Sequence, residues 1–289
     1  MRAHPLVLTC LVLAVGCGRA PAPAAPADAN AAPAPATAEE TGFPPVPPVT
    51  LEVGAHTDEE VDALIASLQR LVSGLDAPET WAKDASLHFW RLQNRIERKT
   101  LTDPQAARVA TAIRAMAEAH PADRDYLEHR AWMAEHIGVG RVAPDIQGTD
   151  LDGAAFTLGE TRGKVTVLVF TGEWCGPCRS EYPYQRLLLE LYADRPFALV
   201  GVNSDPKLET AKQGKIDSRL PYRSWWDGNQ EENTRGPIAT AWGVTGWPTI
   251  YILDAKGVIR FAGMRHEDTL KAVSQLMQEL PRETTSGSS

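Results

Sequence analysis

The spacing of apolar residues divides the chain into two regions after about its first fifty positions. From residue 57 to 137 apolar residues recur every three or four positions, which is the period of an amphipathic helix. From Val142 onward, short runs rich in β-branched residues alternate with helical stretches, a pattern typical of α/β folds. We therefore expect a small all-α helical region at 56–140, followed by an α/β domain at 141–281.

Four helices are expected in the all-α region. The sequence TDEE at 57–60 has the form of a capping box that starts the first helix, and Gly74 ends it. The second helix is expected at about 79–99 and the fourth at about 122–137. The third is expected to begin at Asp103 as its N-cap, with Pro104 in the first turn. The all-α region contains three histidines that could be considered as metal ligands, His120, His129 and His136. They lack the four-residue spacing that places two ligands on one helix face, so we expect no metal site.

The α/β domain contains apolar runs that predict buried strands. Strands are expected at 164–170, 197–203, 249–253 and 258–262, the last two joined by a hairpin turn, and helices at about 175–193 and 267–280. The stretch between 204 and 237 is long and polar. Within it we expect one of the adjacent Trp225 and Trp226 to be buried and the other to be partly exposed.

The beginning of the chain carries a different signal. The apolar run from Leu6 to Val15 follows a basic residue and is too short to span a bilayer. The small residues before Cys17 resemble a bacterial lipobox, which predicts cleavage before Cys17 and lipidation of its sulfur. The expected organisation is a lipoprotein signal peptide at 1–16, a disordered Ala/Pro-rich linker at 17–55 and a disordered tail at 282–289. A plain secretory signal, with Cys17 incidental, is the alternative.

Net charge and cysteine content limit which functions the sequence supports. The net charge is −8, so a broad electrostatic affinity for nucleic acid is not expected. Of the four cysteines, Cys10 is expected to leave with the signal peptide and Cys17 to carry the lipid. The pair Cys175 and Cys178 then remains in the folded protein.

The motif C-G-P-C at 175–178 is the main candidate for chemistry. It lies where a predicted buried strand gives way to a helix. The free N–H groups and the dipole at a helix N-terminus favour a thiolate and lower the pKa of a thiol there. We therefore expect Cys175 to be the nucleophile and Cys178, one turn later, to be the resolving thiol. A purely structural disulfide would close too short a loop to stabilise the fold much, and a zinc site would need two further ligands.

These residues resemble the thioredoxin superfamily, and within it the membrane-anchored TlpA/ResA-like thiol–disulfide oxidoreductases. The motif Trp174–Cys178 matches the active-site motif of that branch, and segments 143–145 and 150–153 resemble its extra N-terminal β-hairpin. The resemblance implies a thioredoxin fold, with a central mixed β-sheet flanked by helices. Pro183 falls where the family kinks its first active-site helix.

The resemblance also implies roles for individual residues. Glu181 matches an acidic residue thought to assist proton transfer at the cysteines, although a solvated first-turn glutamate is the alternative. Val169 stands where thioredoxin has a buried aspartate, which makes another proton acceptor more necessary. Glu173, just before the motif, is expected to be an exposed charge at the rim.

The sequence Trp247-Pro248-Thr249 is a second motif that resembles the family. In this superfamily a cis-proline faces the C-x-x-C motif and opens the next strand, and cis bonds are uncommon elsewhere. The backbone of residue 247 is then free to pair with an extended substrate. The expected substrate-binding residues are Trp174, Gly176, Pro177, Trp247 and Pro248.

The function expected from this resemblance is the reduction of disulfides in exported proteins by the C-G-P-C pair. It implies a membrane electron donor, a lipid anchor, a periplasm-facing location in the cell envelope and no cofactor, and we expect a monomer. Gly18 lacks the aspartate that commonly retains lipoproteins at the inner membrane, which favours the outer membrane where two exist. A thiol peroxidase and a non-catalytic binding module remain as alternatives.

Overall fold

The computed structural model describes residues 50–73, 98–228 and 235–281. The lipobox with Cys17, the linker, the predicted helix at 79–99 and the tail at 282–289 lie outside the described residues. No helix in the described part of the chain has the length and apolar character needed to cross a membrane.

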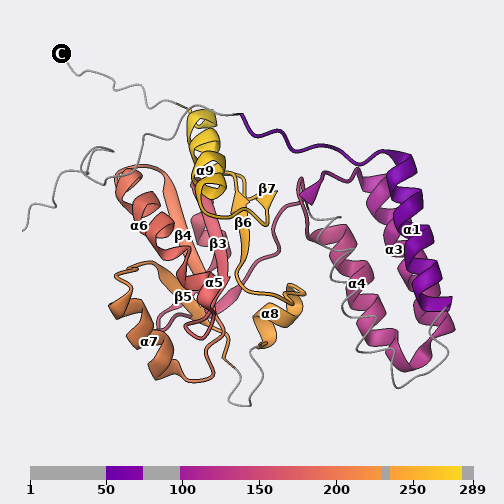
Figure 1. Cartoon of the computed structure of the whole chain (residues 1–289), viewed down its shortest axis with the longest axis horizontal. Helices are drawn as coiled ribbons and strands as arrows, with labels where there is room; N and C mark the ends of the chain where they lie inside the picture. The colour runs from indigo at the N-terminus through magenta and orange to yellow at the C-terminus, as the bar shows by residue number, and fades with distance from the viewer. Residues whose placement is uncertain (1–49, 74–97, 229–234, 282–289) are drawn as a thin grey trace, which may run out of the picture. The chain divides into compact units, whose positions relative to one another are not determined.

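The first described elements are helical, as expected (Figure 1). They are α1 (Asp58–Ser73), α3 (Asp103–Ala119), the short 3-10 helix η1 (Pro121–Asp123) and α4 (Arg124–His136). At the start of α1, the Glu60 N–H donates to Thr57 Oγ1 at 3.2 Å and the Thr57 N–H donates to Glu60 Oε2 at 3.2 Å, which confirms the capping box. Apolar residues of α1, α3 and α4 share one core cluster.

The N-cap of α3 differs by one residue from the sequence prediction. Thr102, not Asp103, has the extended backbone of an N-cap, and its side chain accepts the Gln105 N–H. The Gln105 side chain in turn accepts the Thr102 N–H at 3.0 Å. Asp103 already lies inside the first turn, because this second capping box satisfies the N–H groups that an Asp103 cap would have served.

The α/β part is a five-stranded mixed sheet in the order β5-β4-β3-β6-β7, together with a small hairpin. The strands of the sheet are β3 (Val165–Thr171), β4 (Phe197–Asn203), β5 (Arg223–Trp226), β6 (Thr249–Leu253) and β7 (Ile259–Ala262). β3, β4 and β5 are parallel, and β6 and β7 are antiparallel to their neighbours. The hairpin β1 (Gln147–Thr149) and β2 (Ala155–Thr157), followed by η2 (Leu158–Thr161), confirms the expected N-terminal addition.

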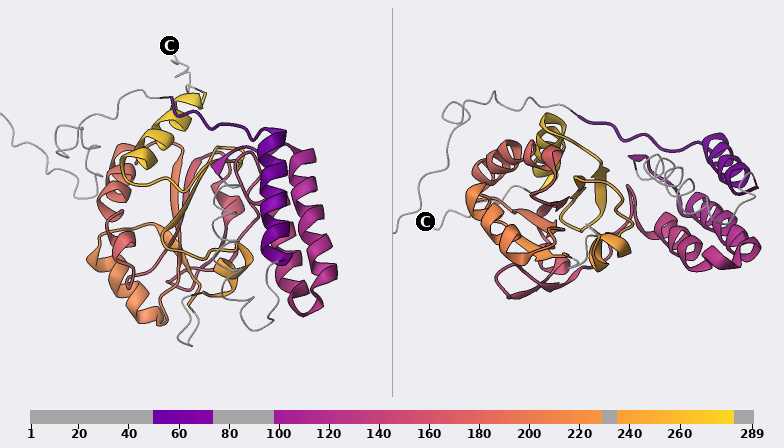
Figure 2. Two further views of the ribbon diagram at one scale, coloured as in Figure 1. Left: turned by 45° about the vertical axis from the view of Figure 1, so that its right-hand side comes forward. Right: turned by 60° about the horizontal axis from the view of Figure 1, so that its bottom comes forward.

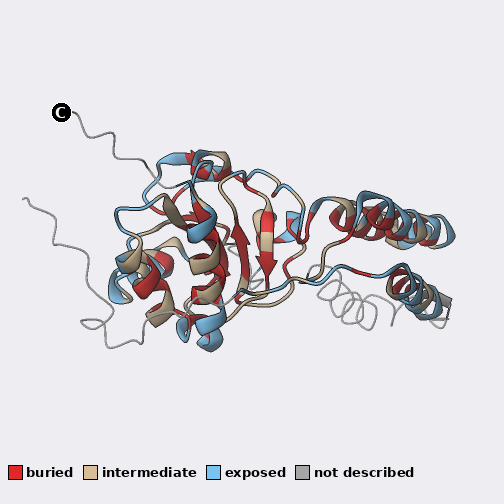
Figure 3. Ribbon diagram, turned by 90° about the horizontal axis from the view of Figure 1, so that it is seen from above, coloured by how far each residue is buried: buried red, intermediate tan, exposed pale blue. Residues whose placement is uncertain are grey.

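The central strand β3 is buried on both faces, which explains its unbroken apolar run (Figure 3). Alternate residues serve opposite faces. Val165, Val167 and Val169 pack with α6 (Tyr182–Leu191) and α9 (Glu267–Glu279), which Figures 1 and 2 show on one side of the sheet. Leu168 and Phe170 belong to the other core cluster.

The core on that second face joins distant segments of the chain. Trp225 is fully buried and stacks on Phe156 of the hairpin at a centroid distance of 3.8 Å. Trp226 is partly exposed, so the expectation for this pair of tryptophans is confirmed. The same cluster includes Met133 and Ile137 from the end of the helical region.

Among the helices and strands that the sequence did not predict, one group lies between β4 and β6. It consists of β5, α7 (Leu208–Asp217) and α8 (Pro237–Ala241), all within or just after the polar stretch there. In addition, the helix expected at 175–193 consists of two pieces, α5 (Gly176–Arg179) and α6. Pro183 lies in the first turn of α6, where its missing N–H is tolerated.

Candidate functional site

The cysteine pair lies at the carboxyl end of β3, where the chain turns into α5. Cys175 and Cys178 form a disulfide with a Cα–Cα distance of 5.2 Å. Cys175 is the N-cap of α5, and its sulfur accepts the Cys178 N–H at 3.2 Å. Cys178 is fully buried, whereas Cys175 retains a small exposed fraction of 5%. The residue expected to supply the nucleophile is therefore the less buried of the two.

The expected cis-proline lies at the same edge of the sheet. The Trp247–Pro248 peptide bond is cis. Thr249, which follows it, pairs with Phe170 near the end of β3. The rings of Trp247 and Trp174 meet edge to face at a centroid distance of 5.5 Å. Two loops that are far apart in sequence therefore meet beside the disulfide.

The other expected substrate-binding residues lie on the outer side of this junction. Trp174 is exposed by 44% of its surface, an unusual value for so large an apolar side chain. Gly176 and Pro177 are exposed as well, while Trp247 is partly exposed and Pro248 is buried. The exposed residues that flank Cys175 in the chain are therefore apolar and include one aromatic ring.

Glu181 is buried rather than solvated, with 1% of its surface exposed. Its Oε2 accepts the backbone N–H of His266 at 2.9 Å. Its Oε1 has no hydrogen bond but lies 3.5 Å from His266 Nε2 and 3.9 Å from Arg265 Nε. The alternative of a solvated first-turn glutamate is wrong, because the β7–α9 turn covers this carboxylate.

Arg265 connects Glu181 to the proline loop. Its Nη2 donates to the carbonyl oxygen of Pro248, and its Nε faces Glu181. Burial lowers the pKa of the Arg265 guanidinium, while the Glu181 carboxylate acts in the opposite direction. The acidic residue of the active-site helix and the cis-proline are thus linked by one side chain.

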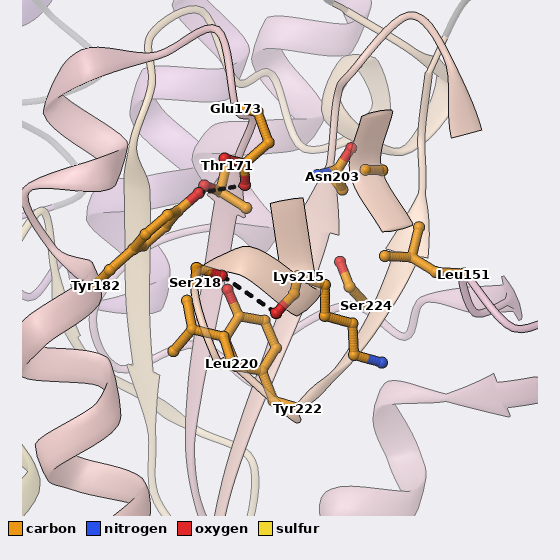
Figure 4. Close-up of a pocket in the computed structure, with 11 residues that line it drawn as sticks. Leu151, Thr171, Glu173, Tyr182, Asn203, Lys215, Ser218, Leu220, Tyr222 and Ser224 are labelled. Atoms are coloured by element: carbon orange, nitrogen blue, oxygen red, sulfur yellow. Dashed lines mark hydrogen bonds between the residues drawn. The ribbon is translucent and has the colours of Figure 1, made fainter. Parts of the chain in front are cut away.

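Glu173 is not the exposed rim charge that the sequence suggested. Its carboxylate accepts a hydrogen bond of 2.6 Å from the Tyr182 hydroxyl, and its side chain packs so closely on Gly214 of α7 that a Cβ there would lie 2.2 Å from Glu173 Cδ. Figure 4 shows both side chains at a pocket that is also lined by Thr171, Asn203, Lys215 and Tyr222. Burial, then the hydrogen bond to Glu173, raises the pKa of Tyr182.

Some residues at the site were missed by sequence reasoning. Arg265 and His266 come from the turn before the last helix and carry no local signal. Asn203 ends the parallel strand β4, and Ser204 and Asp205 follow it. Polar residues at that position are a recognisable signal of a site at the carboxyl edge of a sheet. Among the described residues, no three His, Cys, Asp or Glu side chains converge as metal ligands would.

Part of the chain is similar to known proteins. Residues 139–262 match the model of the AhpC/TSA family. The chain is 31% identical over 125 residues to the thiol-disulfide oxidoreductase ResA of Geobacillus thermodenitrificans, covering 43% of this chain and 68% of that protein. It is 32% identical over 139 residues to the thioredoxin-like protein YneN of Bacillus subtilis, covering 46% of this chain and 76% of that protein.

A solved structure is also similar to part of the chain. It is the thioredoxin domain of a thiol-disulfide oxidoreductase from Bacteroides vulgatus, with 25% identity and a TM-score of 0.45, covering 49% of this chain and 99% of that one.

Proposed function

Because the chain belongs to the ResA-like thiol–disulfide oxidoreductases of the thioredoxin superfamily, we propose that it reduces disulfides of exported proteins through Cys175 and Cys178. The observation that carries this proposal is the disulfide at the head of α5, with the less buried sulfur first and a cis-proline loop beside it. The aromatic surface next to the pair suits an unfolded or extended polypeptide better than a small polar thiol.

The proposed reaction has two exchange steps. The Cys175 thiolate attacks one sulfur of the substrate disulfide, a mixed disulfide forms, and the other substrate sulfur leaves as a thiolate that takes up a proton. Cys178 then loses its proton and attacks Cys175, so that the substrate leaves as a dithiol and the Cys175–Cys178 disulfide forms. Two electrons pass to the substrate, and a dithiol donor must return them.

Glu181 is the proposed proton acceptor for the resolving step. It lies three residues after Cys178 as the N-cap of α6, is buried, and has one carboxylate oxygen without a hydrogen bond. Val169 occupies β3 as a fully buried apolar residue, so it offers no proton acceptor of its own. The proton of Cys178 therefore needs another acceptor, and the Glu181 carboxylate is the one we propose.

Trp174, Gly176, Pro177, Trp247 and Pro248 are the proposed substrate-binding residues. Trp174 and Trp247 offer a rigid aromatic contact for side chains that flank the target disulfide, because their rings already pack on one another. The backbone of Trp247 is the proposed partner for an extended substrate segment.

The proposed location is the cell envelope, facing the periplasm. The lipobox-like sequence before Cys17 supports lipid anchoring, with the outer membrane favoured by Gly18. A monomer that exchanges electrons with a membrane donor is the proposed form of the protein.

Trapping of mixed disulfides tests the function. In Cys178→Ser the first exchange step proceeds but the second cannot, so substrate proteins are expected to remain attached to Cys175. Non-reducing electrophoresis of envelope extracts, followed by mass spectrometry of the adducts, measures this.

The double variant Cys175→Ser/Cys178→Ser is the control for that experiment. Recovery of no adducts above the control would refute disulfide exchange. Rapid consumption of hydrogen peroxide by the wild-type protein would instead favour a thiol peroxidase, and envelope thiol status unaffected by Cys175→Ser would favour a binding module.

A further inference from the structure

The segment that follows β4 contacts both loops of the site. The Ser204 N–H donates to the carbonyl of Thr171 at 2.9 Å, just before the cysteine loop, and Ser204 Oγ accepts from Trp247 Nε1 at 3.2 Å. The carbonyl of Asp205 accepts from Trp226 Nε1 at 2.8 Å. A short segment therefore orients two indole rings and the end of β3.

The Asp205 side chain holds the turn that leads into Cys175. The Glu173 N–H donates to both carboxylate oxygens, at 2.9 and 3.1 Å. The Asn203 amide donates at 2.8 Å. The turn closes with a bond of 3.1 Å from the Cys175 N–H to the carbonyl of Gly172. One carboxylate thus accepts from a backbone N–H group within the turn that ends at the nucleophile.

Asp205 is 1% exposed, and the hydrogen-bond donors to its carboxylate among the described residues, the Glu173 N–H and the Asn203 amide, carry no positive charge. Burial raises its pKa, against the hydrogen bonds from Asn203 and Glu173. A buried charge without a cation is costly, and here its described partners are the backbone of the turn before Cys175 and a neighbouring amide.

We propose that Asp205 is a positioning residue for the redox pair, which fixes the turn 172–175 and with it the orientation of Cys175 and Trp174 toward a substrate disulfide. The inference rests on the proposed function, since it gives the turn a role in disulfide exchange. Without the carboxylate, the Glu173 N–H loses its acceptor, and the turn must move to reach water. A shift of this kind at a reacting group slows the reaction even though the sulfurs are unchanged.

The elements packed around Asp205 carry few other titratable groups. Glu173 and Arg179 lie on the cysteine side, where Arg179 Nη1 donates to the carbonyl of Glu173. Asp227 follows β5, and its N–H bonds to the carbonyl of Asn203 at 2.7 Å. Lys207 lies on the same segment as Asp205. The experiment must separate Asp205 from Glu173 and Asp227.

Asp205→Asn is the variant that tests the proposal. It keeps the size of the side chain but presents an amide N–H₂ group where a carboxylate oxygen accepted hydrogen bonds. We expect a rate of exchange with a disulfide-containing peptide about tenfold lower than wild type at pH 7. In the oxidised wild-type protein, where neither cysteine titrates, we also expect a change in tryptophan emission on acidification that is absent from Asp205→Asn.

Asp227→Asn is the matched control. Asp227 is equally buried, and burial raises its pKa as well, but its carboxylate accepts from the N–H groups of Ile238 and Ala239 at the start of α8. It is expected to lower thermal stability while it leaves the exchange rate and the acid-induced emission change in place. If Asp205→Asn does not fold, Asp205→Glu, which keeps the charge on a longer side chain, is expected to fold and still exchange slowly.

Three results would overturn the proposal. They are a wild-type rate in folded Asp205→Asn or Asp205→Glu, an equal loss of rate in Asp227→Asn, and an emission change that persists in Asp205→Asn but disappears in Glu173→Gln. None of these would affect the proposed function, because Cys175→Ser abolishes exchange in either case, whereas failure of the trapping experiment would remove both.

Discussion

At the scale of single residues, the environment of Glu181 has a direct consequence for the chemistry. Its carboxylate is enclosed by the turn that carries Arg265 and His266, and this turn also bonds to Pro248. A carboxylate held in this way has a fixed direction, which a solvated side chain would lack. A substitution at this position therefore affects both proton transfer and the contact with the β7–α9 turn.

Glu181→Gln separates those two effects. The amide oxygen still accepts the His266 N–H, but the side chain no longer takes up a proton. We expect disulfide exchange to fall by about 10²-fold, in the range found for loss of a general base, with little change in thermal stability. Stopped-flow fluorescence with a disulfide peptide measures the rate.

Glu190→Gln, on the exposed side of the same helix, is the control and should exchange like wild type. Wild-type kinetics in Glu181→Gln would show that this carboxylate takes no part in proton transfer.

At the scale of secondary-structure elements, capping decides where the helices of the N-terminal region begin. α3 starts with reciprocal bonds between Thr102 and Gln105, and its apolar face then supplies Val109 and Ile113 to the core that it shares with α1 and α4. The cap and the buried face act on the same helix, so a weaker cap reduces the stability of that core.

Thr102→Ala is expected to destabilise the folded chain by about 1 kcal/mol, because it removes the acceptor for the Gln105 N–H. Chemical denaturation measures the change in the free energy of unfolding. Thr111→Ala, at an exposed interior position of the same helix, is the matched control and should be neutral or slightly stabilising. Equal effects of the two substitutions would contradict the capping argument.

At the scale of the whole molecule, the helical region and the sheet share a core. Met133 and Ile137 belong to the same cluster as Trp225, Trp242 and Tyr251. A Cβ at Gly243, just after α8, would lie 2.1 Å from Met133 Cε, and its φ of +58° is one that residues with side chains rarely adopt. The end of α4 is therefore packed against the loop that leads to β6.

A double-mutant cycle tests this packing. Gly243→Ala is expected to destabilise the protein by more than the ~1–2 kcal/mol of backbone strain alone, and Met133→Ala is expected to recover the excess. Gly153→Ala is the control, since Gly153 has a φ of +86° with no atom within 4 Å of an added Cβ. Gly153→Ala should lower the free energy of unfolding by the same amount with and without Met133→Ala. If Gly243→Ala also lowers it equally in both backgrounds, the proposed packing of Gly243 against Met133 is refuted.

Much of the fold was predictable because its strongest elements are periodic over their whole length. The buried strands β3 and β4 and the helix α9 lie within a residue or two of their expected limits. By contrast, α7 buries only Ala211 and Gly214 among its residues, and β5 is four residues long, so neither has a pattern that stands out from a polar loop. Their positions depend on pairing with β4 and on the core around Trp225.

The sequence alone determined the chemistry available at the Cys175–Cys178 pair and the strand-to-helix junction that carries it, since both depend on residues close together in the chain. Only the tertiary structure decided what surrounds that pair. Glu181 meets His266 across 85 positions and Asp205 meets Glu173 across 32, while Glu173 itself turns inward to Tyr182. Burial and hydrogen-bond partners depend on how distant segments pack, and no local pattern of apolar and polar residues specifies that packing.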